Sequence, residues 1–366
     1  MTTYSPLNTN EDQVVTRTLL HEAIPLTGTI VSGTYADANI KDYAHGMFQS
    51  VYDYPYLSSS ANHIFDITAG YSAQSDLSSS SNTQNSKKLN IYSQMAQVLV
   101  GYDSNGSILS FDQDGDFAGS GGTKHNDLVM FNFARLLTKD EIKKGTFEME
   151  LGVTPTYATD NSVFSSRIKI TDYSGSNGFL VNSPAGEYGV LYATQSAGTN
   201  ILAADQRYAV GLVYYQAGIA VISGSIFNDE SKGGILNDSF GHVEFNGASA
   251  TTEDFNAVLT GSQISGACDN IRNRLYNIQF NNTIELNSSI YFCRVKNNQY
   301  NYSSNPTYLS SSQIRVKEFS TDMPVSYITT VGLYSSSNEL LAVAKLSEPL
   351  KKTPDTEFTI RVRLDY

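Results

Sequence analysis

Three aspartates at alternate positions have the spacing that best fits a known kind of site chemistry. Asp112, Asp114 and Asp116 stand in the segment DQDGD, as carboxylates do at the start of a calcium-binding loop. The sixth loop position is Phe117, where glycine is needed, and the twelfth is Thr123, where a bidentate glutamate is needed. We therefore expect no tight calcium binding. The two interpretations are a solvated acidic turn and an unusual calcium site completed by other loops.

No other residues are spaced as a metal site or a catalytic motif requires. No two of the five histidines lie within four residues of each other: His21, His45, His63, His125 and His242. The glycine-rich phosphate motifs, the nucleophile elbow and the HExxH zinc motif are missing from the sequence. We expect no catalytic residue, no cofactor and no enzymatic activity. A hydrolase built from distant residues, such as a glycan hydrolase with paired carboxylates, is the alternative.

The composition narrows the classes of partner. The chain has 366 residues, with 24 Lys+Arg against 36 Asp+Glu and a net charge of −12. This balance argues against a general nucleic-acid binder and against docking on anionic membranes, which both need clustered basic side chains. No apolar run reaches the roughly 18 residues of a membrane-spanning helix, and the N-terminus lacks a signal-peptide pattern. Cys268 and Cys293 are expected to be two small hydrophobic side chains without a disulfide role.

Apolar spacing predicts three helices, over 38–53, 89–99 and 262–276. From about residue 145 the spacing changes to period two, as in Phe147–Leu151 and Arg167–Ile170. Turn clusters recur between these segments, which is typical of a sandwich or jelly-roll domain built from short strands. The abundance of Tyr (24) and Phe (17) also favours strands.

The last forty residues carry the clearest pattern. Tyr327–Tyr334 and Glu339–Leu346 flank a polar turn and predict a β-hairpin. The final strand alternates, which puts five apolar residues on one face: Phe358, Ile360, Val362, Leu364 and Tyr366. We expect this face to be buried against the hairpin, so that truncation after Thr353 would unfold the protein.

These patterns predict an α+β fold dominated by β-structure. We divide the chain into an extended arm over 1–36, a mixed core over 37–145 and 291–366, and a β-rich inserted domain over 146–290. The inserted domain is expected to be a β-sandwich or jelly-roll-like. The core is expected to end in an antiparallel hairpin and a terminal strand. The arm is expected to wrap a neighbouring protein, as segments that order on binding can do.

Five segments resemble virion structural proteins of contractile-tailed phages, especially T-even-like cyanophages and their marine relatives. They are Met47–Pro55, Ser58–His63, Asn301–Tyr308, Ile328–Tyr334 and Leu340–Leu346, about a tenth of the chain. The last two form a Gly-Leu-Tyr, polar turn, Glu-Leu-Leu-Ala-Val-Ala pattern that looks like a hairpin of baseplate and tail-fibre attachment domains.

The resemblance implies a virion location, in the baseplate or tail, after assembly in the host cytoplasm. It implies protein partners, namely other virion proteins, with a homo-oligomer or a symmetric ring placement. No nucleic-acid or membrane partner is expected, because of the charge balance. It assigns no chemical role to any residue. The alternatives are a neck or tail-terminus protein and a receptor- or carbohydrate-binding virion module. The latter would need an exposed aromatic patch within 146–290.

Overall fold

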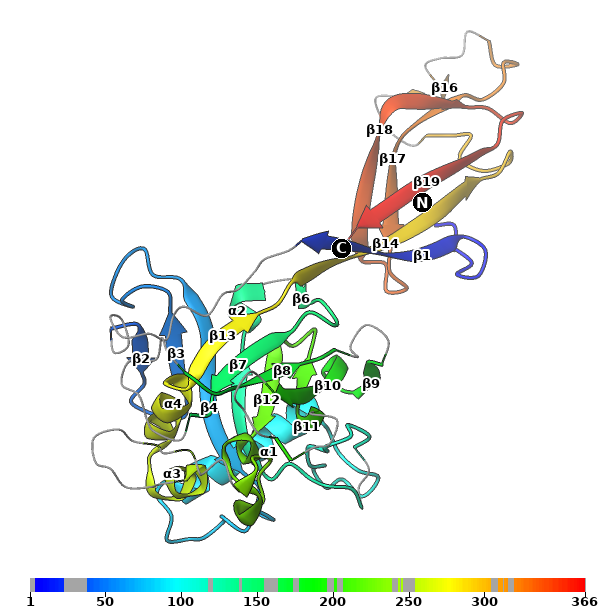
Figure 1. Cartoon of the computed structure of the whole chain (residues 1–366). Helices are drawn as coiled ribbons and strands as arrows, with labels where there is room; N and C mark the ends of the chain where they lie inside the picture. The colour runs from blue at the N-terminus through cyan, green and yellow to red at the C-terminus, as the bar shows by residue number, and fades with distance from the viewer. Residues whose placement is uncertain are drawn as a thin grey trace. The chain divides into compact units, whose positions relative to one another are not determined.

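A computed structural model describes most of the chain as two compact units. Unit 1 comprises residues 1–19 and 285–366, and unit 2 comprises residues 20–284 (Figure 1). The described residues are 4–22, 38–117, 121–137, 140–154, 164–173, 178–195, 201–202, 207–238, 243, 245, 254–303, 309–311, 313–314 and 319–365. Within them, the side chains of 17–22, 207, 284–286, 309–310 and 313–314 are not described.

Unit 2 is organised by one antiparallel sheet. The strands follow in the order β2 (Ile40–Asp42), β3 (Gln49–Tyr52), β4 (His63–Tyr71), β5 (Asp127–Asn132), β12 (Ile219–Ser223), β11 (Arg207–Tyr214), β10 (Gly186–Gln195), β8 (Arg167–Thr171), β7 (Glu148–Gly152) and β13 (Leu275–Gln279). Strand β9 (Leu180–Ser183) pairs with β10 outside this order. The α+β, β-dominated class predicted from the sequence is therefore confirmed.

The predicted boundary near residue 145 is wrong, because it cuts through this sheet. Strand β12 pairs with β5 from Ile219↔Asn132 to Ser223↔Leu128. This ladder joins the strands of the predicted inserted domain to those of the predicted core. Residues 146–290 are thus β-rich as expected, but their strands do not form a separate sandwich or jelly roll. The periodicity was local, whereas this pairing connects segments far apart in the sequence.

The predicted helix over 38–53 is also wrong, because β2 and β3 occupy this stretch. Ile40 pairs with Val51, and Gly46 turns the chain between the strands with φ +61°. Val51 is fully buried, as are its polar neighbours Gln49 and Ser50. Helical spacing of apolar residues occurs here by coincidence, and pairing with β4 decides the outcome.

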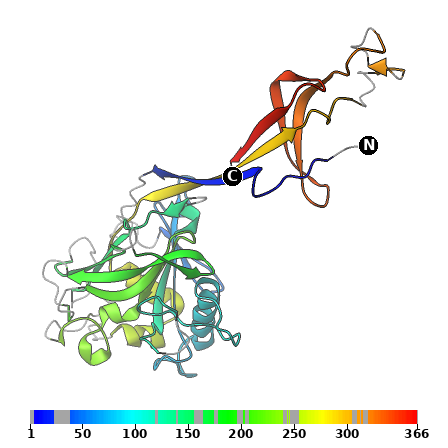
Figure 2. The same cartoon turned by 90° about the vertical axis from the view of Figure 1, so that its right-hand side faces the viewer.

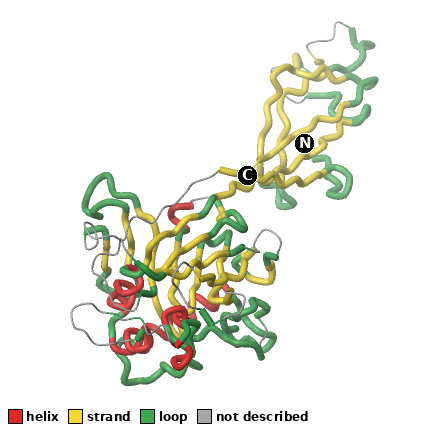
Figure 3. Tube along the Cα trace, viewed as in Figure 1, coloured by secondary structure: helices red, strands yellow, loops and turns green. Residues whose placement is uncertain are grey.

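Helices border the strands of unit 2 in more than one place (Figures 2 and 3). They are α1 (Asn85–Leu99), α2 (Ala134–Leu137), α3 (Phe255–Gly261) and α4 (Ile264–Arg272), with short 3-10 turns η3 (Gly224–Phe227) and η4 (Glu230–Lys232). The predicted helices over 89–99 and 262–276 are confirmed as α1 and α4. Helix α1 packs closely on β4, where a Cβ on Gly70 would lie 2.6 Å from the Lys88 carbonyl oxygen.

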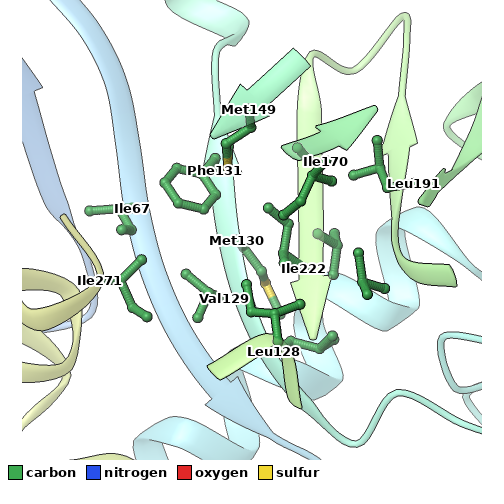
Figure 4. Close-up of a cluster of buried hydrophobic side chains, with 14 of the residues drawn as sticks. Ile67, Leu128, Val129, Met130, Phe131, Met149, Ile170, Leu191, Ile222 and Ile271 are labelled. Atoms are coloured by element: carbon green, nitrogen blue, oxygen red, sulfur yellow. The ribbon is translucent and has the colours of Figure 1, made fainter. Parts of the chain in front are cut away.

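The core of unit 2 lies on both faces of its central strands. Leu128, Val129, Met130 and Phe131 are consecutive in β5 and all buried. Figure 4 shows side chains from β4, β7, β8, β10, β12 and α4 meeting around them. A strand that is apolar at every position is expected where both faces are covered.

Unit 1 contains a small sheet and a long hairpin. The sheet order is β1 (Gln13–Glu22), β14 (Asn282–Val295) and β19 (Phe358–Asp365), and the short β6 (Glu141–Ile142) pairs with the first residues of β14. The hairpin is β17 (Ser326–Tyr334) with β18 (Leu340–Lys352), and β15 (Leu309–Ser310) pairs with β16 (Gln313–Ile314). The predicted hairpin and terminal strand are confirmed.

Two expectations about this unit need correction. Part of the predicted arm over 1–36 is a sheet strand, β1, while residues 23–37 lie outside the described part. The ladder partner of β19 is β14, from Val295↔Phe358 to Ser288↔Asp365. The alternation of β19 is as predicted. Only Val362 is buried, however; Phe358, Ile360 and Leu364 are half-buried, and Tyr366 is not described.

No helix among the described residues is long and apolar enough to cross a membrane.

Candidate functional site

The two units differ in where they place apolar side chains. Among the described residues, the buried hydrophobic side chains of unit 1 are Val295, Leu333 and Val362, and all others belong to unit 2. The smaller unit nevertheless carries over half of the exposed large hydrophobic residues: Tyr4, Leu7, Val14, Val15, Tyr300, Tyr302, Phe319, Met323, Tyr327, Tyr334, Leu340, Leu341 and Val343. Single exposed apolar side chains are normal, but a contiguous group of them marks an interaction site.

Four of these exposed residues lie near the turn of the hairpin, and Tyr4 contacts one of them. We define the hairpin patch as Tyr4, Tyr334, Leu340, Leu341 and Val343. The rings of Tyr4 and Tyr334 meet edge to face, with centroids 4.9 Å apart. Leu341 and Val343 expose 67% and 52% of their surface. The patch therefore combines residues from the N-terminal segment with both hairpin strands.

Gly332, near the end of β17, leaves room for the side chains of Tyr334 and Leu340. A Cβ on Gly332 would lie 3.0 Å from the Tyr334 ring and 3.3 Å from Leu340 Cδ1. Any larger residue would push both side chains away from the strand. The tip is closed by a turn in which Asn338 has φ +65° and the Glu339 amide donates to Ser335 Oγ at 3.1 Å.

A buried lysine fixes the base of the hairpin. Lys352 is fully buried, and its Nζ donates to the Asn297 carbonyl (2.9 Å), Asn301 Oδ1 (2.7 Å) and the Thr353 carbonyl (2.7 Å). The Ser326 hydroxyl, in the partner strand, donates to the Tyr300 carbonyl. These bonds hold the base while the apolar tip stays exposed. An isolated two-stranded hairpin is marginal in water, so this anchoring matters for its stability.

Such an arrangement can bind another protein surface. Tyr and aliphatic side chains form the desolvated centre of most protein interfaces. Among the described strands, β1 and β19 are the outer ones of their sheet, and the backbone of an outer strand can pair with another strand. The sequence located the hairpin but not the patch. One sequence pattern could have indicated the patch: Leu340–Ala344 is apolar at every position, whereas a strand with one buried face alternates.

The structure brings together the three aspartates singled out from the sequence. One carboxylate oxygen of each of Asp112, Asp114 and Asp116 lies within 4.8 Å of the other two. Asp112 is buried and forms an ion pair with Lys124, while Asp114 and Asp116 are exposed. Asp114 Oδ1 accepts a hydrogen bond from the Asp116 amide at 3.1 Å.

His63 belongs to a partly buried polar cluster that lacks the order of a catalytic triad. Asp66 Oδ1 accepts a hydrogen bond from the Ser50 hydroxyl (2.5 Å) and lies 2.7 Å from His63 Nε2. Burial alone would raise the pKa of Asp66, but the bonds to His63 and Ser50 bring it below its ordinary value. The aspartate thus stands between the serine and the histidine, so the histidine is not placed to accept the serine proton.

The other histidines and both cysteines have no such partners in the described part. His125 is buried, which lowers its pKa to about 4, and His45 lies against Tyr43 and Phe48. The side chains of His21 and His242 lie outside the described residues. Cys268 is buried and Cys293 half-buried; both are free, and burial raises the pKa of each thiol.

Comparison with models of protein families, with curated proteins and with solved structures finds no significant match to this chain.

Proposed function

We propose that this protein is a structural component of a tailed-phage virion, located in the baseplate or tail, and that unit 1 joins it to neighbouring virion proteins. Two of the segments that resemble such proteins, Ile328–Tyr334 and Leu340–Leu346, lie in β17 and β18. The resemblance and the hairpin patch therefore coincide on the same two strands.

The proposal rests on one observation. Among the described residues, unit 1 exposes many large apolar side chains and buries only three. Burial of each large apolar side chain contributes about 1.5–3 kcal/mol of stabilising free energy. Covering an exposed apolar patch with another protein would therefore stabilise the complex. The hairpin patch contains no charged side chain, and its two Tyr rings suit an interface. Contact with a neighbouring protein would complete a core that unit 1 does not supply itself.

The carbohydrate-binding alternative has less support, because two of the three exposed aromatic residues described within 146–290 lie against a cation and the third, Tyr173, packs edge to face on Tyr192. Lys144 Nζ lies 3.6 Å from the centre of the Phe179 ring, and the Arg167 guanidinium lies 4.1 Å from that of Tyr276. A face already covered by a cation is less open to stacking on a sugar.

The proposal is tested by introducing charge into the patch. Particles are prepared from phage carrying Leu341→Asp with Val343→Asp, and the protein is quantified in purified virions by mass spectrometry. We expect at least a tenfold loss of incorporation, because two carboxylates would have to be desolvated at the interface. The matched control is Ser347→Asp, an exposed position in the same strand, which should incorporate normally.

Two results would contradict the proposal. Absence of the wild-type protein from purified particles would exclude the virion role. Equal incorporation of the double variant and the control would exclude the hairpin patch as the contact surface. Thermal unfolding of each variant in isolation separates loss of contact from loss of folding.

A further inference from the structure

We propose that the loop carrying Asp112, Asp114 and Asp116 binds a divalent cation, Ca²⁺, at a site independent of the hairpin patch. The backbone makes the three carboxylates converge. Asp112 pairs with Lys124 in an antiparallel bridge, and the loop then turns back through Gly115 (φ +78°) and Phe117 (φ +55°). The carboxylate oxygens consequently come within 4.8 Å of one another.

A buried carboxylate oxygen in this cluster lacks a partner. The Asp112 side chain is fully buried, and its Oδ2 is paired with Lys124. Its Oδ1 is buried and accepts no hydrogen bond from the described part of the chain, which omits residues 118–120. An unsatisfied buried acceptor costs about 1–3 kcal/mol, and more when it is charged. A bound cation would remove this cost.

Gly122 leaves space beside that oxygen. A Cβ at this position would lie 3.1 Å from Asp112 Oδ1, and the residue has φ +66°. Glycine therefore meets two needs here, the backbone conformation and the room around the unpartnered oxygen.

The charge of the cluster also suits a divalent ion. Three carboxylates and one lysine give a local charge of about −2 when all are ionised. Without a cation, the carboxylates of Asp114 and Asp116 repel each other and that of Asp112. A divalent ion would neutralise the remaining charge.

The loop is held against the sheet of unit 2, which prepares its shape before any ion binds. The Tyr188 hydroxyl donates to the Gly115 carbonyl at 2.7 Å, and Asn182 Nδ2 donates to the Asp116 carbonyl at 3.3 Å. The Phe117 ring stacks on Tyr188 with centroids 4.7 Å apart. All of these contacts leave the carboxylates of Asp114 and Asp116 at the surface.

The three carboxylates indicate which ion the loop would bind and the approximate affinity. Carboxylate oxygens select hard cations, and Ca²⁺ accepts irregular ligand sets completed by water more readily than Mg²⁺ does. A site with three carboxylates and no bidentate glutamate belongs in the weak range, with a Kd on the order of 10⁻⁴–10⁻³ M.

The experiment uses the full chain after treatment with a chelator. Terbium(III) emission sensitised by tyrosine reports binding, since Tyr188 lies beside the loop and the chain has no Trp. We expect CaCl₂ to displace terbium and, at roughly tenfold its Kd, to raise the melting temperature of unit 2. The double variant Asp114→Asn with Asp116→Asn should lose at least tenfold in calcium affinity. Glu230→Gln, an exposed charge loss elsewhere in unit 2, should retain wild-type affinity.

Four outcomes would overturn the proposal. The first is a wild-type protein that does not respond to CaCl₂, and the second is an equal response in the double variant. The third is an equal rise in melting temperature with NaCl of the same ionic strength, which would mean that salt merely screens repulsion. If MgCl₂ displaced terbium as well as CaCl₂ does, the assignment to calcium would be wrong.

Discussion

Unit 2 buries its apolar residues and unit 1 displays them, although both are built from antiparallel strands. In unit 2 the central strand β5 is covered on both faces, and its four middle residues are buried. In unit 1 the hairpin strand β18 is also apolar along Leu340–Ala344, but its side chains are exposed or half-buried. An apolar stretch is therefore buried in one strand and exposed in the other, depending on whether other elements cover the strand.

This difference is the basis of the proposal that unit 1 is completed by contact with another protein, whereas unit 2 supplies its own core. A unit with few buried apolar side chains has little to offset the conformational entropy of its strands. Its buried Lys352 and the ladder between β14 and β19 supply local order. The predictions below test this contrast, from the largest expected change in the stability of unit 2 to the smallest.

Truncation of a core ring in unit 2 should have the largest effect. Phe131 is fully buried in β5, with its ring 5.7 Å from that of Phe65. Phe131→Ala should lower the free energy of unfolding by about 3–5 kcal/mol, because it leaves a cavity in close-packed surroundings. Urea unfolding followed by circular dichroism measures this change. A loss below about 1 kcal/mol would mean that the core collapses around the site and is not close-packed.

Acid should destabilise unit 2 through His125. Burial lowers the pKa of this histidine to about 4 from an ordinary value of 6.5. The unfolded state therefore binds the proton first, and stability falls as the pH decreases from about 6.5 to 4, by on the order of 2–3 kcal/mol. In His125→Gln this part of the pH dependence should disappear. The measurement is urea unfolding at a series of pH values, and identical slopes for the two proteins would refute the prediction.

An exposed residue of the hairpin patch should contribute little to folding. Leu341→Ala should change the free energy of unfolding by less than about 0.5 kcal/mol, because the side chain is mostly in water in the isolated chain. A cost above about 1.5 kcal/mol would show that Leu341 is buried in solution. The patch would then be part of a core, and the contrast between the units would fail.

Removal of the last strand should leave unit 2 almost unchanged. Truncation after Thr353 deletes β19, whose ladder partner Ser288–Val295 belongs to unit 1. The melting temperature of unit 2 should stay within about 2 °C, since distant sites contribute independently. This outcome differs from the expectation from sequence that the truncation unfolds the protein. Calorimetry distinguishes the two, and loss of every cooperative transition would restore the earlier expectation.

Local features of the fold were predictable from the sequence. Helix α1 follows from the stripe of apolar residues that ends before Gly101, and the hairpin follows from two apolar runs around a polar turn. The alternation of β19 also appears as predicted. In each case neighbours within a few residues decide the backbone conformation, and periodicity reports which side of the element is apolar.

The candidate sites were only partly predictable. The spacing of Asp112, Asp114 and Asp116 indicated the loop. The sequence did not indicate that Asp112 Oδ1 is buried without a partner among the described residues. It also did not indicate that Tyr188, far along the chain, supports the loop. The hairpin patch needs Tyr4 beside Tyr334, a contact between opposite ends of the sequence.

Contacts between distant segments were decided by the tertiary structure alone. Pairing of β12 with β5 merged two predicted domains into one sheet, and pairing of β2 and β3 with β4 turned a predicted helix into strands. The physical reason is that a strand gains most of its stability from partners that its own sequence does not specify. Periodicity says which side chains are apolar, but whether they are buried, as in β5, or displayed, as in β18, depends on what the rest of the chain places over them.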